Sequence, residues 1–312
     1  RRMMRVFQEC QLRNLTLAPE TRKLIKANWG LIDGDFRKSK ANRETFRAML
    51  ERKGSVAEIL RMMHRVGVLG RWMPEFGALD CLVQHEFFHR YTADEHTLRC
   101  IEQLDALIED DRRERGIYRK ILTDLEDPYA IYLAMILHDT GRAENVREHT
   151  DGSAILAARV CSRFKIKGAR RTLLTFLVDH HLTYWRYATS KNLEDPEVIE
   201  EFAGIMRNKE RLEALLVFTY ADSNGTNEEA WSPWKETLML QLYRSTRDFL
   251  ANGKNQYDAD QAAELQKLKK RTKNCLKDKY HNQLEIHFDT MPKGYFRYRA
   301  PESLAIHIRA IR

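Results

Sequence analysis

Three apolar runs that end in acidic or histidine residues constrain the fold of this chain most. The first run, YAIYLAMIL, spans 129–137 and is followed by His138 and Asp139. The second, LLTFLV, is followed by Asp179-His180-His181, and the third, LEALLVFTYA, by Asp222. Runs of this kind favour buried helices. Because a carboxylate is disfavoured at the negative, C-terminal end of a helix dipole, we expect a cation where these three helix ends converge.

The composition and the helix-start signals favour an all-α fold. The 312 residues include only seven prolines and 14 glycines, and they are rich in Leu, Arg, Glu and Ala. Thr92–Glu95 reads as a capping box, which predicts a helix containing His96. Asp127-Pro128 and Asp195-Pro196 each read as an N-cap followed by proline at the first helical position. We therefore predict a helical bundle with a sizeable core.

Changes in sequence pattern divide the chain into three regions. Residues 1–80 read as short helices, 81–250 have well-marked helix signals, and 251–312 combine a charged helix with a helical or extended tail. The chain begins RRMMRVFQEC, without a Met-led flexible segment. We therefore expect it to be part of a longer protein.

Charge and cysteine content narrow the partners and the compartment. The net charge of +8 suits an anionic partner, but it is spread along the sequence, so we do not expect a nucleic-acid partner. The five cysteines are widely spaced and include no C-x-x-C pair, which favours a reducing compartment. The longest apolar run has nine residues, too few for a membrane helix. Without a signal peptide, we expect a cytoplasmic protein.

Metal-competent side chains lie at the edges of the apolar runs. A single histidine at a helix end is usually structural, but several such positions favour a metal centre. Asp139 has two oxygens and could bridge two ions about 4 Å apart, an arrangement suited to displacement at phosphorus. Neighbours on a helix point ~100° apart, so only one of His180 and His181 can face the ion. The candidate ligands are His96, His138, Asp139, His149, His181 and Asp222.

A competing pattern is HEFFH at 85–89, which matches the H-E-x-x-H motif of zinc proteases. Five residues with two free positions match often by chance, and the capping box at Thr92 leaves the first helix very short. No third ligand in a recognisable setting follows. We therefore expect His85 and His89 to line the cleft instead.

The motifs together resemble a known family. QHEFFHRYTADEHTL (84–98), the dyad at 138–139, His149, VDHHL (178–182) and ADSNGTN (221–227) resemble the HD phosphohydrolase domain of the bacterial PII uridylyltransferase/uridylyl-removing enzymes. Flanking segments such as MHRVGVLGRWMPEFG and MPKGYF are similar as well. The resemblance covers most of 20–300.

The resemblance implies a domain order and an activity. Residues 1–80 would follow a nucleotidyltransferase domain, 81–250 would form the HD domain, and 251–312 would lead toward an ACT region. Both outer domains are missing from this sequence, so only the removing reaction could occur. That reaction is metal-dependent hydrolysis of UMP from a uridylylated tyrosine of the PII signalling protein. We expect one or two divalent ions, Mg or Mn first and Fe or Zn as alternatives.

The resemblance also implies individual roles. His96 would be the first histidine of the HD pattern, His138 and Asp139 the dyad, and Asp222 the last ligand. The family's Asn-His-Leu element selects His181, and its Asp-His-Ser element falls on His149. After the dyad the family usually reads close to HD-I-A-K-G, whereas this chain reads HDTGRAE. Arg142 would supply the lysine's charge, though not its geometry.

Further residues and two alternatives complete the hypothesis. Asp139 and Arg142 are the expected catalytic residues, and His85, His89, Arg147 and Asn224 are the expected substrate-binding residues. One alternative is an HD hydrolase acting on a free nucleotide or alarmone. The other is a catalytically degenerate HD module that serves as a sensor or scaffold.

Overall fold

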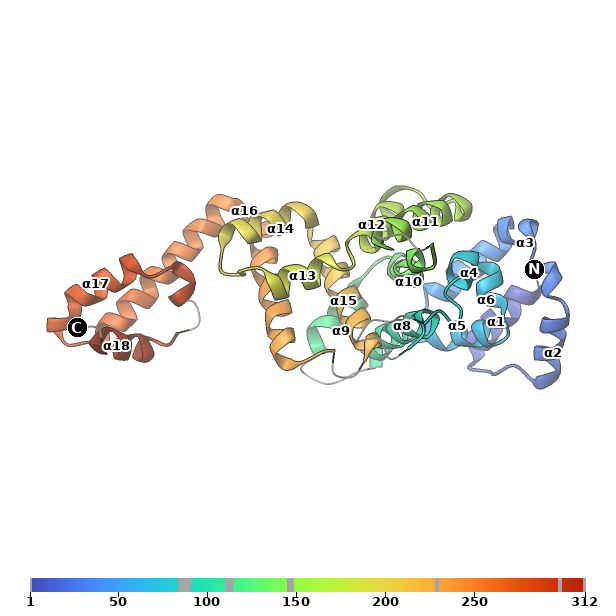
Figure 1. Cartoon of the computed structure of the whole chain (residues 1–312), viewed down its shortest axis with the longest axis horizontal. Helices are drawn as coiled ribbons and strands as arrows, with labels where there is room; N and C mark the ends of the chain where they lie inside the picture. The colour runs from blue at the N-terminus through green and yellow to red at the C-terminus, as the bar shows by residue number, and fades with distance from the viewer. Residues whose placement is uncertain are drawn as a thin grey trace. The chain divides into compact units, whose positions relative to one another are not determined.

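Helices make up the regular structure of this chain (Figure 1). The computed structural model describes residues 2–83, 91–109, 115–144, 149–227, 230–296 and 299–310, and no strand occurs within these ranges. The predicted all-α class is therefore confirmed. Across the same ranges, every helix is too short or too polar to cross a membrane.

The chain divides into two compact units. The first comprises 1–186 and 210–239, and the second comprises 187–209 and 240–312. The described α-helices of the first unit, in chain order, are α1 (Arg2–Arg13), α2 (Pro19–Ala27), α3 (Gly34–Lys38), α4 (Lys40–Leu50), α5 (Val56–Arg65), α6 (Val68–Trp72), α7 (Pro74–Gly77), α8 (Ala93–Glu109), α9 (Gly116–Asp124), α10 (Pro128–Leu137), α11 (His149–Phe164), α12 (Gly168–His180) and all but the first residue of α15 (Lys209–Thr226).

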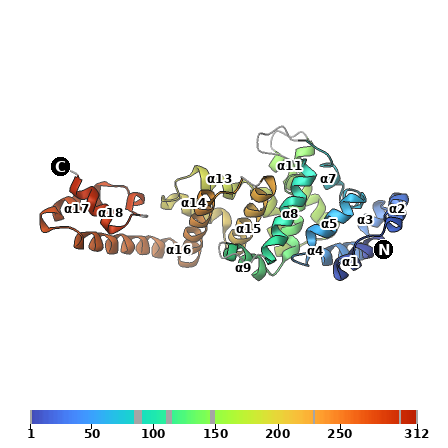
Figure 2. The same ribbon diagram turned by 90° about the horizontal axis from the view of Figure 1, so that it is seen from below.

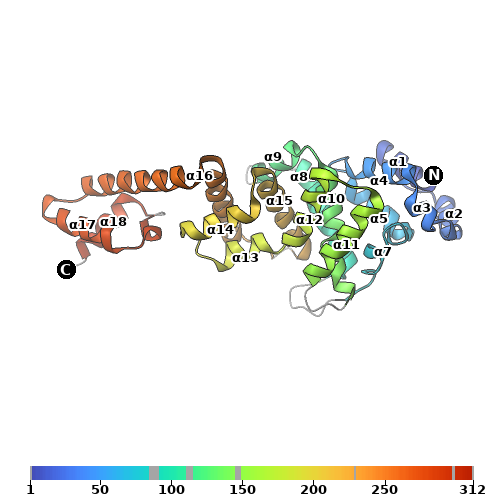
Figure 3. The same ribbon diagram turned by 90° about the horizontal axis from the view of Figure 1, so that it is seen from above.

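Helix α10 forms the centre of the first unit. All ten of its residues are buried, as expected for the apolar run at 129–137. Helices α4, α8, α11 and α12 pack against it, and Figure 3 shows α10, α11 and α12 close together. The continuous apolar run in the sequence thus forms a helix that is covered by neighbouring helices on every face.

Charged side chains join α5 to α8, which lie side by side in Figure 2. Two nitrogens of Arg61 donate to the two carboxylate oxygens of Glu95 at 2.7 and 2.9 Å, and its Nε donates to Glu102. One turn further along α5, His64 Nε2 lies 3.0 Å from Asp94 Oδ2. These contacts hold the N-terminal half of α8, which contains His96, against α5.

Asp105 adds a buried contact to the same interface. Its carboxylate accepts hydrogen bonds from the backbone N–H groups of Gly54 and Ala57, at 3.0 and 2.6 Å, and from the Tyr132 hydroxyl at 2.6 Å. The first N–H groups of a helix have no partner within it, so this carboxylate caps the start of α5. Burial raises the pKa of Asp105 to about 6 despite these donors.

A glycine allows α15 to approach α8 closely. A Cβ placed on Gly225 would lie 2.5 Å from Cys100 Sγ and 2.8 Å from the Cys100 backbone nitrogen. Any side chain at 225 would therefore collide with backbone as well as with sulfur. Gly225 follows Asp222 by one turn, and Cys100 follows His96 by one turn, so this contact brings the two metal-competent residues together.

The second unit has a separate small core. It contains the second half of α13 (Thr183–Ser190), α14 (Pro196–Met206), the greater part of α16 (Pro233–Asn274), α17 (His281–Thr290) and α18 (Pro301–Ala310). Leu284, Phe288, Phe296 and Leu304 are among the buried residues of this core, and the rings of Phe288 and Phe296 stack at 4.2 Å. Helix α16 is interrupted at Gly253, which has a φ of 75°. The tail predicted as helical or extended is largely helical.

Candidate metal centre

The ends of α10 and α12 place two histidines in the same way. His138 and His181 follow these helices directly and are each 1% exposed. His138 Nδ1 lies 2.8 Å from the Met135 carbonyl, and His181 Nδ1 lies 2.7 Å from the Val178 carbonyl. A carbonyl only accepts, so Nδ1 is the protonated nitrogen in both rings. Each ring therefore directs the lone pair of its Nε2 into the interior, as metal-binding histidines do.

Five of the six predicted ligands meet in this interior. Asp222 Oδ1 lies 3.1 Å from His96 Nε2 and 3.5 Å from His138 Nε2. Asp139 Oδ2 lies 3.6 Å from His138 Nε2 and 3.8 Å from His96 Nε2. Asp139 Oδ1 lies 3.9 Å from His181 Nε2. The ends of α10 and α12 thus converge, as predicted. Asp222 joins them from within α15, because that helix continues to Thr226 instead of ending at the acid.

These separations fit a divalent ion. An ion with bonds of about 2.1 Å keeps adjacent ligands roughly 3.0–3.4 Å apart and opposite ligands roughly 4.2 Å apart. His96, His138 and Asp222 form a group whose ligand atoms all lie within 4.8 Å of one another. The buried Nε2 of His138 has no hydrogen-bond partner in the described part of the chain. The donor set therefore fits an ion that accepts both nitrogen and oxygen ligands.

The electrostatics of the centre also favour a cation. Burial alone would raise the pKa of Asp139, but the charges of His138 and Arg142 hold it well below its usual range. Burial likewise opposes ionisation of Asp222, yet the neighbouring imidazoles of His138 and His96 lower its pKa. Two ionised carboxylates in a buried space need positive charge nearby.

The histidines of the centre differ in their protonation. Burial, followed by repulsion from His138, lowers the pKa of His181 to about 4. Burial also disfavours the charged forms of His96 and His138, but the neighbouring carboxylates raise the pKa of both. His181 is therefore neutral at pH 7, the form that binds a metal ion.

A cavity of about 480 Å³ opens beside these ligands. Arg142 lines it, with its Nε 2.8 Å from Asp139 Oδ2. On another wall, the Lys235 ammonium lies 4.7 Å from the centre of the Trp185 ring and donates to the Ala230 carbonyl at 2.7 Å. One end of the cavity is thus the polar candidate metal centre, and the wall formed by Trp185 is suited to a flat organic group.

Several predicted residues lie elsewhere or outside the described part of the chain. His85, His89 and Arg147 fall outside the described residues. His149 begins α11, but its side chain is not described. Asn224 donates to the Tyr220 carbonyl at 2.8 Å and does not line the cavity, whereas Asn227 does. The expected substrate contact of Asn224 is therefore not supported.

The structure distinguishes the two adjacent histidines. His180 is partly exposed, and its Nδ1 lies 3.3 Å from the Thr183 hydroxyl. His181 faces Asp139 instead. The residue that the resemblance selected is the one that faces the interior.

Sequence reasoning missed three residues of the site. Cys100 Sγ lies 3.5 Å from His96 Nε2, and burial and then Asp222 raise the pKa of its thiol. Trp185 and Lys235 line the cavity. Helical spacing was the available signal for Cys100 alone, because it follows His96 by four positions within α8.

A second group of possible metal ligands comprises His64, Asp80 and Asp94. His64 Nε2 lies 3.0 Å from Asp94 Oδ2 and 3.9 Å from Asp80 Oδ1. A hydrogen bond to Asp94 raises the pKa of His64, although burial opposes this. We interpret the group as an ion pair between α5 and α8.

Comparison with known proteins agrees with the resemblance. Residues 1–72 match a family model described as the third domain of uridylyltransferase GlnD. The chain is 37% identical to a bifunctional uridylyltransferase/uridylyl-removing enzyme of Pseudomonas fluorescens over 75% of its own length and 26% of that protein. It is 34% identical to the enzyme of the same description from Methylococcus capsulatus, over 93% of this chain and 33% of that protein. The counterpart from Cereibacter sphaeroides is 34% identical over 78% of this chain and 26% of that protein.

The chain spans about a quarter to a third of the length of these relatives. The similarity nevertheless extends over most of the chain. These comparisons support the bifunctional uridylyltransferase/uridylyl-removing enzymes as the family to which this stretch of sequence is related.

Proposed function

We propose that this chain is a metal-dependent phosphodiesterase of the HD type, which hydrolyses UMP from a uridylylated tyrosine of PII. The observation that supports it best is the meeting of three imidazoles and two carboxylates beside a cavity of about 480 Å³. The names of the relatives include uridylyl removal. We assign the HD domain to 81–250, following the sequence prediction.

The proposed ligands are His96, His138, Asp139, His181 and Asp222, with His149 as a sixth from the sequence. Magnesium or manganese is the proposed ion, and iron or zinc would also accept this donor set. A bound divalent ion would polarise the phosphoryl oxygens and lower the pKa of water in the site. The backbone carbonyls of Met135 and Val178 hold the His138 and His181 rings in place for it.

Other residues of the cavity would receive the substrate. The Trp185 ring is suited to stacking on the uracil base, and Lys235 adds positive charge beside it. Arg142 lies against Asp139. A phosphoryl oxygen close to this pair could accept a hydrogen bond from the guanidinium, which would offset its developing charge.

The leaving group of the proposed reaction is the tyrosine phenol, which needs little assistance from the site. Water adds to phosphorus, the bond from phosphorus to the tyrosine oxygen breaks, and a proton is transferred to that oxygen, which gives UMP and tyrosine. The phenol has a pKa of about 10. It leaves more readily than a sugar alkoxide, so a strong general acid is not required.

The test combines metal analysis with a product assay. We expect the purified chain to hold divalent metal and to release UMP from uridylylated PII, detected by chromatography. His181→Ala should remove most of both, because it deletes a buried nitrogen ligand. His180→Ala is the matched control, since it removes the neighbouring ring that points away. UMP release that persists at the wild-type rate in Asp139→Ala or Asp222→Ala would refute the proposal.

A second candidate is hydrolysis of a free nucleotide, favoured by the cavity of about 480 Å³ beside Trp185. Assaying uridylylated PII beside a panel of free nucleotides separates the two, because only one class should be turned over efficiently. A chain that binds no metal and hydrolyses neither would instead be a degenerate module.

A further inference from the structure

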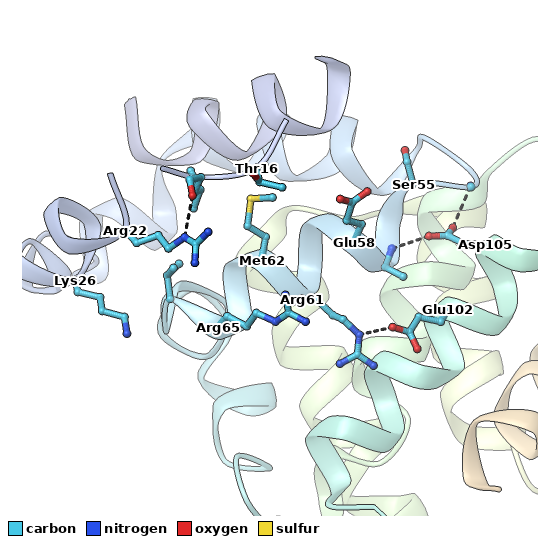
Figure 4. Close-up of a pocket in the computed structure, with 14 residues that line it drawn as sticks. Thr16, Arg22, Lys26, Ser55, Glu58, Arg61, Met62, Arg65, Glu102 and Asp105 are labelled. Atoms are coloured by element: carbon cyan, nitrogen blue, oxygen red, sulfur yellow. Dashed lines mark hydrogen bonds and ion pairs between the residues drawn. The ribbon is translucent and has the colours of Figure 1, made fainter. Parts of the chain in front are cut away.

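A second cavity, of about 510 Å³, lies in the first unit and is lined by positively charged side chains (Figure 4). Arg22 and Lys26 line it from α2, and Arg61 and Arg65 line it from α5. In each helix the two cations are four residues apart and so lie on the same face. No residue that lines this cavity also lines the cavity at the candidate metal centre.

Only one of the four cations has a matching acid. Arg61 is bound to Glu95 and Glu102. Arg22 donates through Nε to the Leu17 carbonyl at 2.8 Å, which orients its guanidinium without neutralising it. Across the described ranges, Arg22, Lys26 and Arg65 have no ion-pair partner.

The acids around the cavity do not balance these charges. Glu102 is bound to Arg61, and Asp105 accepts from the backbone of α5 and from Tyr132. Glu58 is the remaining acid in the lining. Like charges four residues apart on a helix are unfavourable, and Arg22 and Lys26 form such a pair on α2. On α5 only Arg65 adds to this positive charge, because Arg61 is paired with two acids. An anion between the two helices would reverse the sign of this interaction.

We propose that this cavity is a binding site for a small phosphate- or carboxylate-bearing ligand. Arg22, Lys26 and Arg65 would contact the anionic group, and Leu17 and Met62 would contact an apolar portion of the ligand. Guanidinium groups suit such anions because they donate two parallel hydrogen bonds. The site is independent of the proposed hydrolase activity, because it shares no residue with it.

The probe for this site is inorganic pyrophosphate, titrated into the metal-free chain by isothermal calorimetry. We expect one binding event that weakens as salt is added. Lys26→Ala and Arg65→Ala should each weaken binding by roughly tenfold, because each removes a charged donor. Far-UV circular dichroism should remain unchanged, since both side chains are exposed.

Two control variants make the result decisive. Lys23→Ala removes the same charge from the same helix at a residue that does not line the cavity, and it should leave the affinity unchanged. Arg142→Ala alters the other cavity and should also have no effect. Absence of pyrophosphate binding, equal weakening by Lys23→Ala and Lys26→Ala, or loss of binding in Arg142→Ala would each overturn the proposal.

Discussion

Replacing Asp105 by Asn should change how the stability of the first unit depends on pH. Asp105 is 9% exposed and has a pKa of about 6 in the folded protein, against a reference of 3.8. Between these values the folded state binds more protons at this residue than the unfolded state does. Stability from this group therefore rises as the pH falls through about 6, and it levels off below the unfolded pKa.

The size of the effect follows from these two pKa values. Between pH 7.5 and pH 5, protonation of Asp105 should add about 1.4 kcal/mol to the free energy of unfolding of the wild type. Asn cannot titrate, so the variant lacks this increment. A comparison of the two proteins at a single pH is ambiguous, because the substitution has a second effect. The Asn amide N–H₂ faces one of the three groups that donate to Asp105, and this costs about 1–3 kcal/mol at any pH. The quantity to measure is therefore how the difference in unfolding free energy between wild type and variant changes with pH.

Tryptophan fluorescence during urea unfolding gives a suitable assay. All five tryptophans lie within 1–186 or 210–239, so the signal reports the first unit. The difference between wild type and Asp105→Asn should grow in favour of the wild type from pH 7.5 to pH 5. Tyr132→Phe is a useful companion, since the hydroxyl that it removes lowers the pKa of Asp105. A difference that is flat across this range, or that shrinks, would refute the reasoning.

Three further predictions concern single contacts. Gly225→Ala should destabilise the first unit by about 1–3 kcal/mol in urea unfolding, because the added Cβ would collide with the Cys100 backbone. Gly116→Ala is the control and should be neutral or stabilising, because a Cβ added there has no atom within 4 Å. Arg61→Ala should cost about 1–3 kcal/mol by the same measurement, whereas Arg47→Ala, which loses an exposed pair with Glu51, should cost less than about 1 kcal/mol. Trp185→Ala should raise KM for uridylylated PII about tenfold and change metal content little; an unchanged KM would exclude stacking on this ring.

Helix ends were the most predictable part of the site. The apolar run before His138 has no polar face, so its burial and the direction of its last residues followed from the sequence. Distances between helices were not predictable, because no sequence pattern states that Asp222 and His96 approach to 3.1 Å. Trp185 and Lys235 were missed for a related reason, since they meet only through the packing of separate helices.

The outcome for Asn224 shows a further limit of sequence reasoning. A polar residue two positions after Asp222 was expected in the cleft, but the helix continues to Thr226 and directs Asn224 to a carbonyl of its own backbone. Asn227, just beyond the helix end, takes the place in the cavity. The predicted boundaries near 80 and 250 and the metal-binding roles remain predictions.

The close contact between Gly225 and Cys100 has a consequence for protein design. A designer who moved the five ligand side chains onto another helical scaffold would copy the chemistry but lose the spacing, because ordinary helix pairs are held apart by side chains at their crossing point. The part to transfer is therefore the helix crossing itself, in which Gly225 of one helix contacts Cys100 of the other. A ligand, Asp222 or His96, lies one turn before each of these two residues. Grafting should begin from that crossing, and the remaining ligands can then be added around it.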